Sequence, residues 1–251
     1  MANSSKQNDL VNEAYLDKFQ FRRKLALMAI WIIPIVVFGL YKVIPVFYEK
    51  SPSVQEDLSE FSVVNMRVVL LSLHTYSDLF GVLPAPIAVD KEMKPIHSWR
   101  TAILPYMELK DFYELVDPLN TPWNEGQNLH LQETKMPHYF SPRSETTSEW
   151  CTCYALVVGK ETVFENHPHF TIESTGGPRL PKKRTGLLIE LTKSDIAWME
   201  PRDVTIDEAI AIIQNSKLRG GTLVGFSDRH VEAIPPTTSE DEIRRLFSTI
   251  E

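Results

Sequence analysis

An uninterrupted apolar stretch near the N-terminus constrains this chain more than any other feature. Residues 25–41 carry no charge, and after Lys42 apolar residues continue to Tyr48. A helix over residues 25–41 would be roughly 26 Å long at about 1.5 Å per residue. With the continuation to Tyr48, the stretch exceeds the ~30 Å hydrocarbon core of a bilayer. We therefore expect one transmembrane helix over residues 25–48.

Two other interpretations of this stretch stay open on the sequence alone. A cleaved signal peptide would have a shorter apolar core and an Ala-x-Ala-like cleavage site, and no such site follows Tyr48. A helix buried in a protein core rarely runs this long without polar residues. Pro34 does not argue against a span, because neighbouring groups can satisfy the carbonyl that it frees.

The charges that flank the apolar stretch indicate its orientation. A basic cluster precedes it, whereas the two basic residues that follow are diluted by acidic ones. Cationic residues on a short N-terminal flank keep that flank in the cytoplasm. We expect a cytoplasmic tail over residues 1–24, a single pass through the cytoplasmic membrane over 25–48, and a periplasmic or otherwise extracytoplasmic domain over 54–251.

Composition and motifs narrow the classes of function. The formal net charge is −7, and no basic stripe with interleaved aromatic residues is present, which argues against binding of nucleic acid. The sequence has no nucleophile elbow, zinc-protease motif, phosphate-binding glycine loop or calcium loop. We therefore expect no enzyme activity, no cofactor and no metal.

A helix is predicted from Val54 to about Phe80, with Gly81 as its C-terminal stop. Its apolar residues form two adjoining stripes, and an apolar arc this wide predicts burial against a sheet. The first stripe consists of Leu58, Phe61, Val64, Val68 and Leu71, and the second of Val63, Met66, Leu70 and Leu73.

The remainder of the chain predicts an α+β fold. A turn-rich insertion over about 82–145 includes a short helix near 110–116. Strand patterns follow at 151–158 and 186–191, and a hairpin is predicted from 222–226 and 230–234. Capping boxes that begin at Thr205 and Ser239 predict two short C-terminal helices.

Two clusters combine tryptophan with charged residues, the pattern of either a binding cleft or a buried network. The first is His97, Trp99 and Arg100, and the second is Trp198, Glu200, Arg202 and Asp203. In one interpretation they form a shared cleft, with both indole rings stacking on a solute and an arginine binding its carboxylate bidentately. In the other, an arginine pairs with a carboxylate inside the domain and the rings cover the pair, which is the more common arrangement for such motifs.

Cys151 and Cys153 are the only cysteines. On a strand, side chains two residues apart share a face, so a bridge between them would distort the backbone. Three interpretations remain open: two half-buried strand residues, a disulfide within or between chains, or a metal site that includes His167 and His169. The spacing of a complete metal-ligand set is missing.

An ordered series of short motifs resembles the planctomycete pilin-like family called domain of unknown function 1559. The similarity covers about 65–234, and no motif is specific alone. The motifs are Asn65 with Leu-His-Thr-Tyr at 73–76, His97-Ser98-Trp99-Arg100, Leu104-Pro105-Tyr106, Pro122-Trp123-Asn124, Met136-Pro137, Thr152 with Tyr154, Trp198 to Asp203, and Gly220-Gly221 leading into Phe226 to Val231. At the hairpin, Arg229 stands where the family has glycine.

The resemblance implies a pseudopilin-like architecture, in which a membrane helix is followed by a second, amphipathic helix that packs on an antiparallel β-sheet. We expect a single-pass, membrane-anchored extracytoplasmic protein with a structural or interaction role. Its expected partners are the lipid bilayer and other proteins of the envelope or secretion machinery. The alternative function is a membrane-tethered module that binds a solute or glycan.

Overall fold

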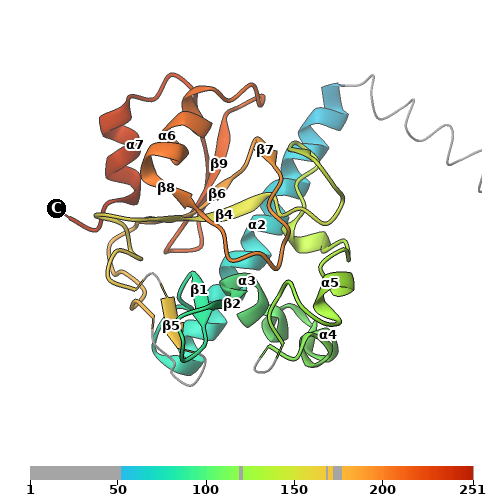
Figure 1. The fold of residues 1–251 in the computed structure, drawn as a ribbon. Coiled ribbons are helices and arrows are strands. Elements are labelled where there is room, and N and C mark those ends of the chain that lie inside the picture. The colour runs from blue at the N-terminus through green and yellow to red at the C-terminus, as the bar shows by residue number, and fades with distance from the viewer. Residues whose placement is uncertain (1–51, 119–120, 168, 172–176, 251) are drawn as a thin grey trace, which may run out of the picture. The chain divides into compact units, whose positions relative to one another are not determined.

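The structure is a computed structural model that describes residues 52–118, 121–167, 169–171 and 177–250 (Figure 1). The chain divides into two compact units, Met1–Glu56 and Asp57–Glu251, and the second of these is the folded α+β domain. The predicted cytoplasmic tail, 1–24, and the predicted membrane segment, 25–48, lie outside the described residues.

A long helix, α2 (Pro52–Phe80), leads into the domain. Its first residue is a proline, whose missing N–H costs nothing in the first helical turn. The helix ends where the chain reverses at Gly81, which has φ +76° and donates its N–H to the Ser77 carbonyl at 2.8 Å. The predicted helix and its glycine stop are therefore present.

A five-stranded sheet in the order β10-β9-β6-β4-β8 forms the centre of the domain. The first four of these strands pair antiparallel, and β8 pairs parallel with β4. The strands are β4 (Tyr154–Val158), β6 (Gly186–Glu190), β8 (Val204–Thr205), β9 (Thr222–Phe226) and β10 (Val231–Ile234).

Both faces of this sheet are covered, because successive side chains of a strand point to opposite faces. In β4, Tyr154 and Leu156 belong to the core cluster shared with α2, whereas Ala155 and Val157 belong to a second cluster. That second cluster is closed by α6 (Ile206–Gln214) and α7 (Glu240–Phe247). Both helices begin at the predicted capping boxes, and Figure 1 shows them together on one face of the sheet.

The turn-rich middle segment adds short elements and two small sheets, β2-β1-β5 and β3-β7. The helix predicted near 110–116 is present as α4. The segment contains β1 (Ile87–Val89), β2 (Pro95–Ser98), α3 (Trp99–Ala102), η1 (Leu104–Met107), α4 (Lys110–Val116), α5 (Asn128–Leu131), η2 (Pro137–Tyr139) and β3 (Glu145–Thr146). Two later strands, β5 (His169–Thr171) and β7 (Lys193–Ser194), complete the two small sheets.

The predicted fold class was wrong in its architecture, which combined an N-terminal transmembrane helix with a second helix packed on an antiparallel β-sheet. The described chain is mixed α+β, and its sheets are not simply antiparallel, because β8, β5 and β7 each pair parallel with a neighbour. Over the residues that the structure describes, no helix has the length and apolar character needed to cross a bilayer. The parallel pairs were missed because strands of two or three residues leave no readable alternation in a sequence.

Burial of α2 also differs from its prediction. Met66, Leu70 and Leu73 of the second stripe are fully buried against the sheet. The approach is close because β9 has Gly225 beneath the helix, where a Cβ would lie 3.0 Å from Leu70 Cδ1. The first stripe, predicted to be buried as well, is open to solvent at Phe61, Val64 and Leu71, which are 60%, 47% and 54% exposed.

The hairpin between β9 and β10 turns at Arg229, which has φ +69°. The left-handed region costs a residue with a Cβ roughly 1 kcal/mol relative to glycine. The turn is closed by the Arg229 N–H, which donates to the Phe226 carbonyl at 2.9 Å, and by the Phe226 N–H, which donates to the His230 carbonyl at 2.8 Å.

Replacing Arg229 by glycine should therefore raise the free energy of unfolding by about 1 kcal/mol, measured by denaturant titration. Arg229→Ala is the control, because it removes the same side chain and keeps the Cβ. A stability gain of equal size in both variants would attribute the effect to the arginine side chain and contradict backbone strain.

Candidate functional site

Arg100 and Asp203 form an ion pair inside the domain, with 2.9 Å between Arg100 Nη2 and Asp203 Oδ1. The two side chains are 0% and 2% exposed. Arg100 lies in α3, which begins where the Ser98 hydroxyl accepts the Arg100 N–H at 3.2 Å. Residues 103 positions apart are thus joined without contact with water.

Asp203 Oδ1 accepts three hydrogen bonds. The donors are Trp99 Nε1 at 3.0 Å, Arg100 Nη2 at 2.9 Å and the backbone N–H of Leu156 at 2.9 Å. Burial raises the pKa of Asp203, and the charge of Arg100 together with these hydrogen bonds opposes the rise. The carboxylate joins α3 to β4 immediately before the chain enters β8.

The remaining donors of Arg100 go to backbone carbonyls. Its Nε and Nη2 donate to the Tyr154 carbonyl at 3.2 and 2.9 Å, and Nη1 and Nη2 donate to the Arg202 carbonyl at 3.4 Å. The guanidinium carbon also lies 4.7 Å from the ring centroid of Trp99. The arginine is therefore surrounded by its own chain, and the bidentate fork proposed for a solute carboxylate is already engaged.

Both tryptophan rings pack in the core. Trp99 and Trp198 are 0% exposed. Tyr139 lies against both, with its ring stacked on Trp198 at 6.2 Å between centroids and edge-on to Trp99 at 6.3 Å, and its hydroxyl donates to the Arg100 carbonyl at 2.7 Å. Trp99 lies against the ion pair, Trp198 packs on Tyr139 and Phe112, and neither buried indole lines an open cleft.

The other members of the predicted cluster lie elsewhere. Glu200 and Arg202 belong to an exposed group in which Arg202 Nε lies 2.8 Å from Glu200 Oε1 and Arg202 Nη1 lies 3.1 Å from Asp195 Oδ1. His97 is buried, with Nε2 2.8 Å from the Thr121 carbonyl oxygen. Of the seven predicted residues, the structure brings together Trp99, Arg100, Trp198 and Asp203.

Burial gives His97 a low pKa. Desolvation lowers it from 6.5 to about 4, and the hydrogen bond with the Thr121 carbonyl and the charge of Asp117 only partly oppose the shift. The imidazole is therefore neutral near pH 7, which suits it to hold the loop at Thr121 rather than to bind an anion.

A second buried network, centred on Glu190 in β6, was not predicted from the sequence. Ser141 donates its hydroxyl proton to Glu190 Oε1 at 2.6 Å, and Arg143 Nη2 lies 3.5 Å from Glu190 Oε2. Ser62 of α2 shares a 2.8 Å hydrogen bond with Ser141. Burial raises the pKa of Glu190. A lone carboxylate in the apolar run 186–191 was the available signal, because such a charge needs partners when it is buried.

Cys151 and Cys153 are both buried as free thiols. Burial raises the pKa of Cys153 to about 11, and its Sγ lies 3.8 Å from the Ser141 carbonyl oxygen. β4 begins only at Tyr154, while Cys151 makes an isolated bridge to Ala197. In the part of the chain that the structure describes, no three His, Cys, Asp or Glu residues are grouped to hold a metal.

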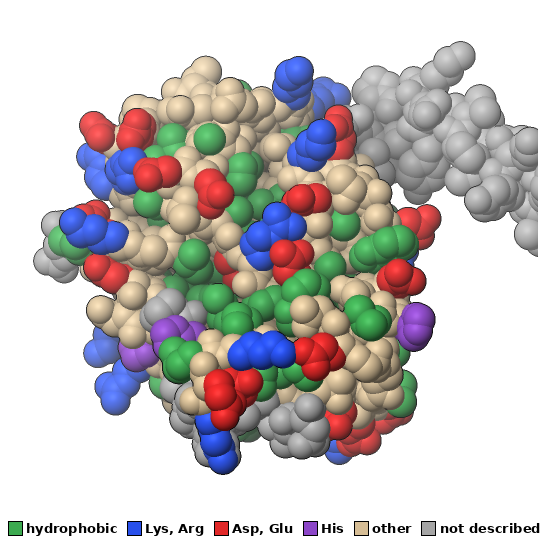
Figure 2. Space-filling model, viewed as in Figure 1, with side chains coloured by type: hydrophobic (Ala, Val, Ile, Leu, Met, Phe, Trp, Pro, Cys, Tyr) green, Lys and Arg blue, Asp and Glu red, His purple; other side chains and the backbone are tan. Residues whose placement is uncertain are grey.

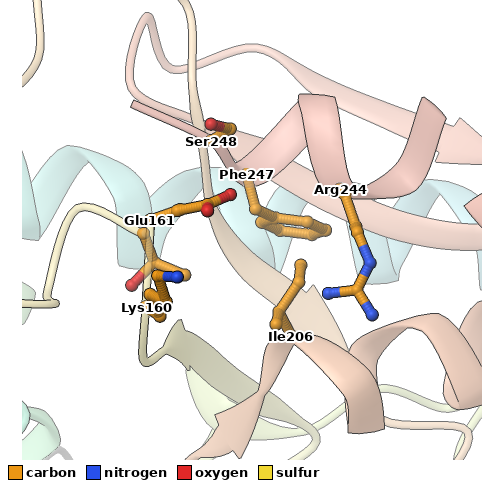
Figure 3. Close-up of a pocket in the computed structure, with 7 residues that line it drawn as sticks. Lys160, Glu161, Ile206, Arg244, Phe247 and Ser248 are labelled. Atoms are coloured by element: carbon orange, nitrogen blue, oxygen red, sulfur yellow. The ribbon is translucent and has the colours of Figure 1, made fainter. Parts of the chain in front are cut away.

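A shallow surface hollow lies between α7 and the loop after β4 (Figure 3). It is lined by Lys160, Glu161, Thr162, Ile206, Arg244, Phe247 and Ser248. Arg244 Nη2 is held by Asp207 Oδ1 at 2.6 Å and by Glu240 Oε1 at 2.8 Å. None of the predicted site residues contributes to this hollow.

Residues 63–203 match the family described as "Protein of unknown function (DUF1559)". The match ends at Asp203, so the segment to 234 that the resemblance also included lies beyond it. No curated protein and no solved structure matches the chain. The comparisons therefore do not confirm the pseudopilin-like architecture.

Replacing Asp203 by alanine should lower the free energy of unfolding by about 3–5 kcal/mol, because Arg100 would keep a buried charge without a partner. Arg202→Ala is the matched control, since it removes the two surface ion pairs of the residue next in sequence, with Glu200 and Asp195, and should change stability by at most about 1 kcal/mol. Denaturant unfolding compares the two. Equal losses would show that the buried pair has no special weight.

His97 should make the fold less stable as the pH falls from 6.5 to about 4. In this window the unfolded state binds a proton at His97 and the folded state does not, so stability is lost on acidification, by about 3 kcal/mol over the whole window. The raised pKa values of Asp203 and Glu190 act in the opposite direction.

Those carboxyl groups are common to wild type and His97→Asn, so the difference between their pH–stability curves isolates the histidine. The gap between the two curves should change progressively from pH 6.5 to about 4, in the direction of relative loss for wild type. Parallel curves across this window would contradict a neutral, buried His97.

Proposed function

Because the chain belongs to the DUF1559 family, whose description gives no function, we propose a function from the residues of the chain itself. The protein is a non-catalytic structural or interaction protein held at the outer side of the cytoplasmic membrane. The single observation that carries this proposal is the burial of the motif residues. Trp99, Arg100 and Asp203 hydrogen-bond to one another inside the domain, and Trp198 is enclosed in the core against Tyr139.

Groups that act on a substrate must be reachable by it. Arg100 and Asp203 are paired with each other and buried. Burial raises the pKa of Glu190, and its carboxylate accepts hydrogen bonds from Ser141 and the Leu223 N–H. These charges connect the middle segment to the sheet and give the domain a single arrangement. Such a domain presents surfaces to partners, and its motifs support the fold.

The alternative function, binding of a solute or glycan by the two tryptophans, has no support in the described residues. Stacking on a sugar or metabolite needs an accessible ring face, and both indoles are 0% exposed. The face in Figure 2 shows Lys and Arg side chains interspersed with Asp and Glu. A mixed surface of this kind favours neither a polyanion nor a polycation as partner.

Attachment to the membrane rests on the sequence. The apolar stretch 25–48 ends four residues before α2 begins at Pro52. The basic residues that precede the stretch favour a cytoplasmic N-terminus, and with it an extracytoplasmic position for residues 57–251. The partners proposed on this basis are the lipid bilayer and other proteins of the cell envelope.

Cell fractionation tests the proposal. The full chain with a C-terminal tag should sediment with membranes, resist extraction by high salt, and lose its tag to protease added from the outer side. Deletion of residues 25–48 should release the protein into the soluble fraction. Recovery of the full chain in the soluble fraction, or a tag that only protease on the cytoplasmic side removes, would contradict the proposed location.

A thermal-shift screen of the same purified chain against sugars and small metabolites tests the proposed role. No saturable stabilisation is expected, because the rings and the arginine are enclosed. A saturable shift that Trp198→Phe abolishes would restore the binding function in place of the proposed one.

A further inference from the structure

α2 presents an apolar stripe to solvent along most of its length. Phe61, Val64, Leu71 and Leu79 are 60%, 47%, 54% and 63% exposed, and Val68 is partly exposed between them. An apolar stripe of about 18 residues on one helix is roughly 27 Å long. Exposed apolar side chains that are contiguous in this way indicate a docking surface, in contrast to scattered single ones.

The spacing of the stripe is that of a helix–helix seam. Phe61, Val64, Val68 and Leu71 are separated by steps of three, four and three residues, and Leu79 follows eight residues after Leu71. A narrow stripe with this alternation suits the packing of one helix against another. The neighbouring polar residues on one side belong to the domain itself, because Asn65 donates to the Phe140 carbonyl at 2.8 Å and Ser72 donates to the Tyr106 carbonyl at 3.2 Å.

We propose that the stripe docks on the same stripe of a second copy of this chain, with the two α2 helices parallel and in register. The proposal rests on the membrane attachment of the proposed function. If residues 25–48 of each copy lie in the same membrane, both copies of α2 begin on the same side of that membrane, because only three residues separate Tyr48 from Pro52. A closed pair then uses each stripe once.

The charges beside the stripe favour the parallel arrangement. In a parallel pair, flanking residues approach the side of the partner helix five positions later, and those positions carry no charge opposite Glu60 or Arg67. An antiparallel pair that superposes Phe61 on Leu71 and Val64 on Val68 would instead bring the two copies of Arg67 together. Like charges at a helix interface oppose association.

The size of the stripe explains why the membrane matters. Its exposed side chains offer roughly 300–400 Å² per copy, below the ~800 Å² per partner of a standard stable interface. Confinement in one membrane raises the effective concentration and removes part of the orientational cost of association. The pair is therefore expected between full chains in a membrane, and association in dilute solution should be weak.

Cysteine cross-linking in membranes tests the pair. Leu71→Cys in the full chain should form a disulfide-linked species of twice the chain mass on mild oxidation. Leu115→Cys is the matched control, because Leu115 of α4 is an equally exposed leucine, 57% against 54%, on another element. Both native cysteines are buried, so the unsubstituted chain should give no such species.

Leu71→Cys should cross-link several-fold more than Leu115→Cys, and adding Val64→Glu should reduce the yield several-fold because two glutamates would face each other in the seam. Equal yields at the two positions, or a product whose mass shows a different protein, would overturn the pair while leaving the membrane attachment intact. Recovery of the chain in the soluble fraction would overturn the attachment, and with it this pair.

Discussion

The carboxylate of Asp203 is the interaction on which the rest of the domain depends. One of its oxygens accepts from an indole, a guanidinium and a backbone N–H, and these donors come from α3 and β4. A buried ion pair contributes little net stability, because desolvation offsets the attraction, but removing one partner is costly. What the pair supplies is a direct link between the turn-rich middle segment and the sheet, because Asp203 bonds to both α3 and β4.

Glu190 plays the corresponding role beside α2. Ser62 of the helix, Ser141 of the middle segment and Glu190 of the sheet form one hydrogen-bonded chain, and the Tyr154 hydroxyl donates to the Ser62 carbonyl at 2.8 Å. Tyr154 also connects the two networks, because its own carbonyl accepts from Arg100. Polar groups therefore fix how α2 lies on the sheet, while Met66, Leu70 and Leu73 supply the buried apolar area.

The sequence predicts those features that depend on local chemistry. Gly81 as a helix stop and the capping boxes at Thr205 and Ser239 are read within a few residues, and the structure has each of them. The predicted burial of α2 was right for one stripe and wrong for the other, because spacing along a helix cannot tell which of two adjoining stripes has a sheet beside it. Similarly, Arg202 and Asp203 are adjacent in sequence, yet one is exposed and the other enclosed, which only the tertiary neighbours decide.

Hydrogen exchange at the indole N–H of Trp99 tests the enclosed network most directly. Trp99 Nε1 donates this proton to Asp203 Oδ1 at 3.0 Å, and the Trp99 side chain is fully buried. The proton should therefore exchange only when the whole domain unfolds, with a protection free energy equal to that of global unfolding. The indoles of Trp123 and Trp150, which are partly exposed, should exchange faster. Exchange of the Trp99 proton at the rate of those two would mean that the motif opens to solvent, and would contradict its role as a scaffold.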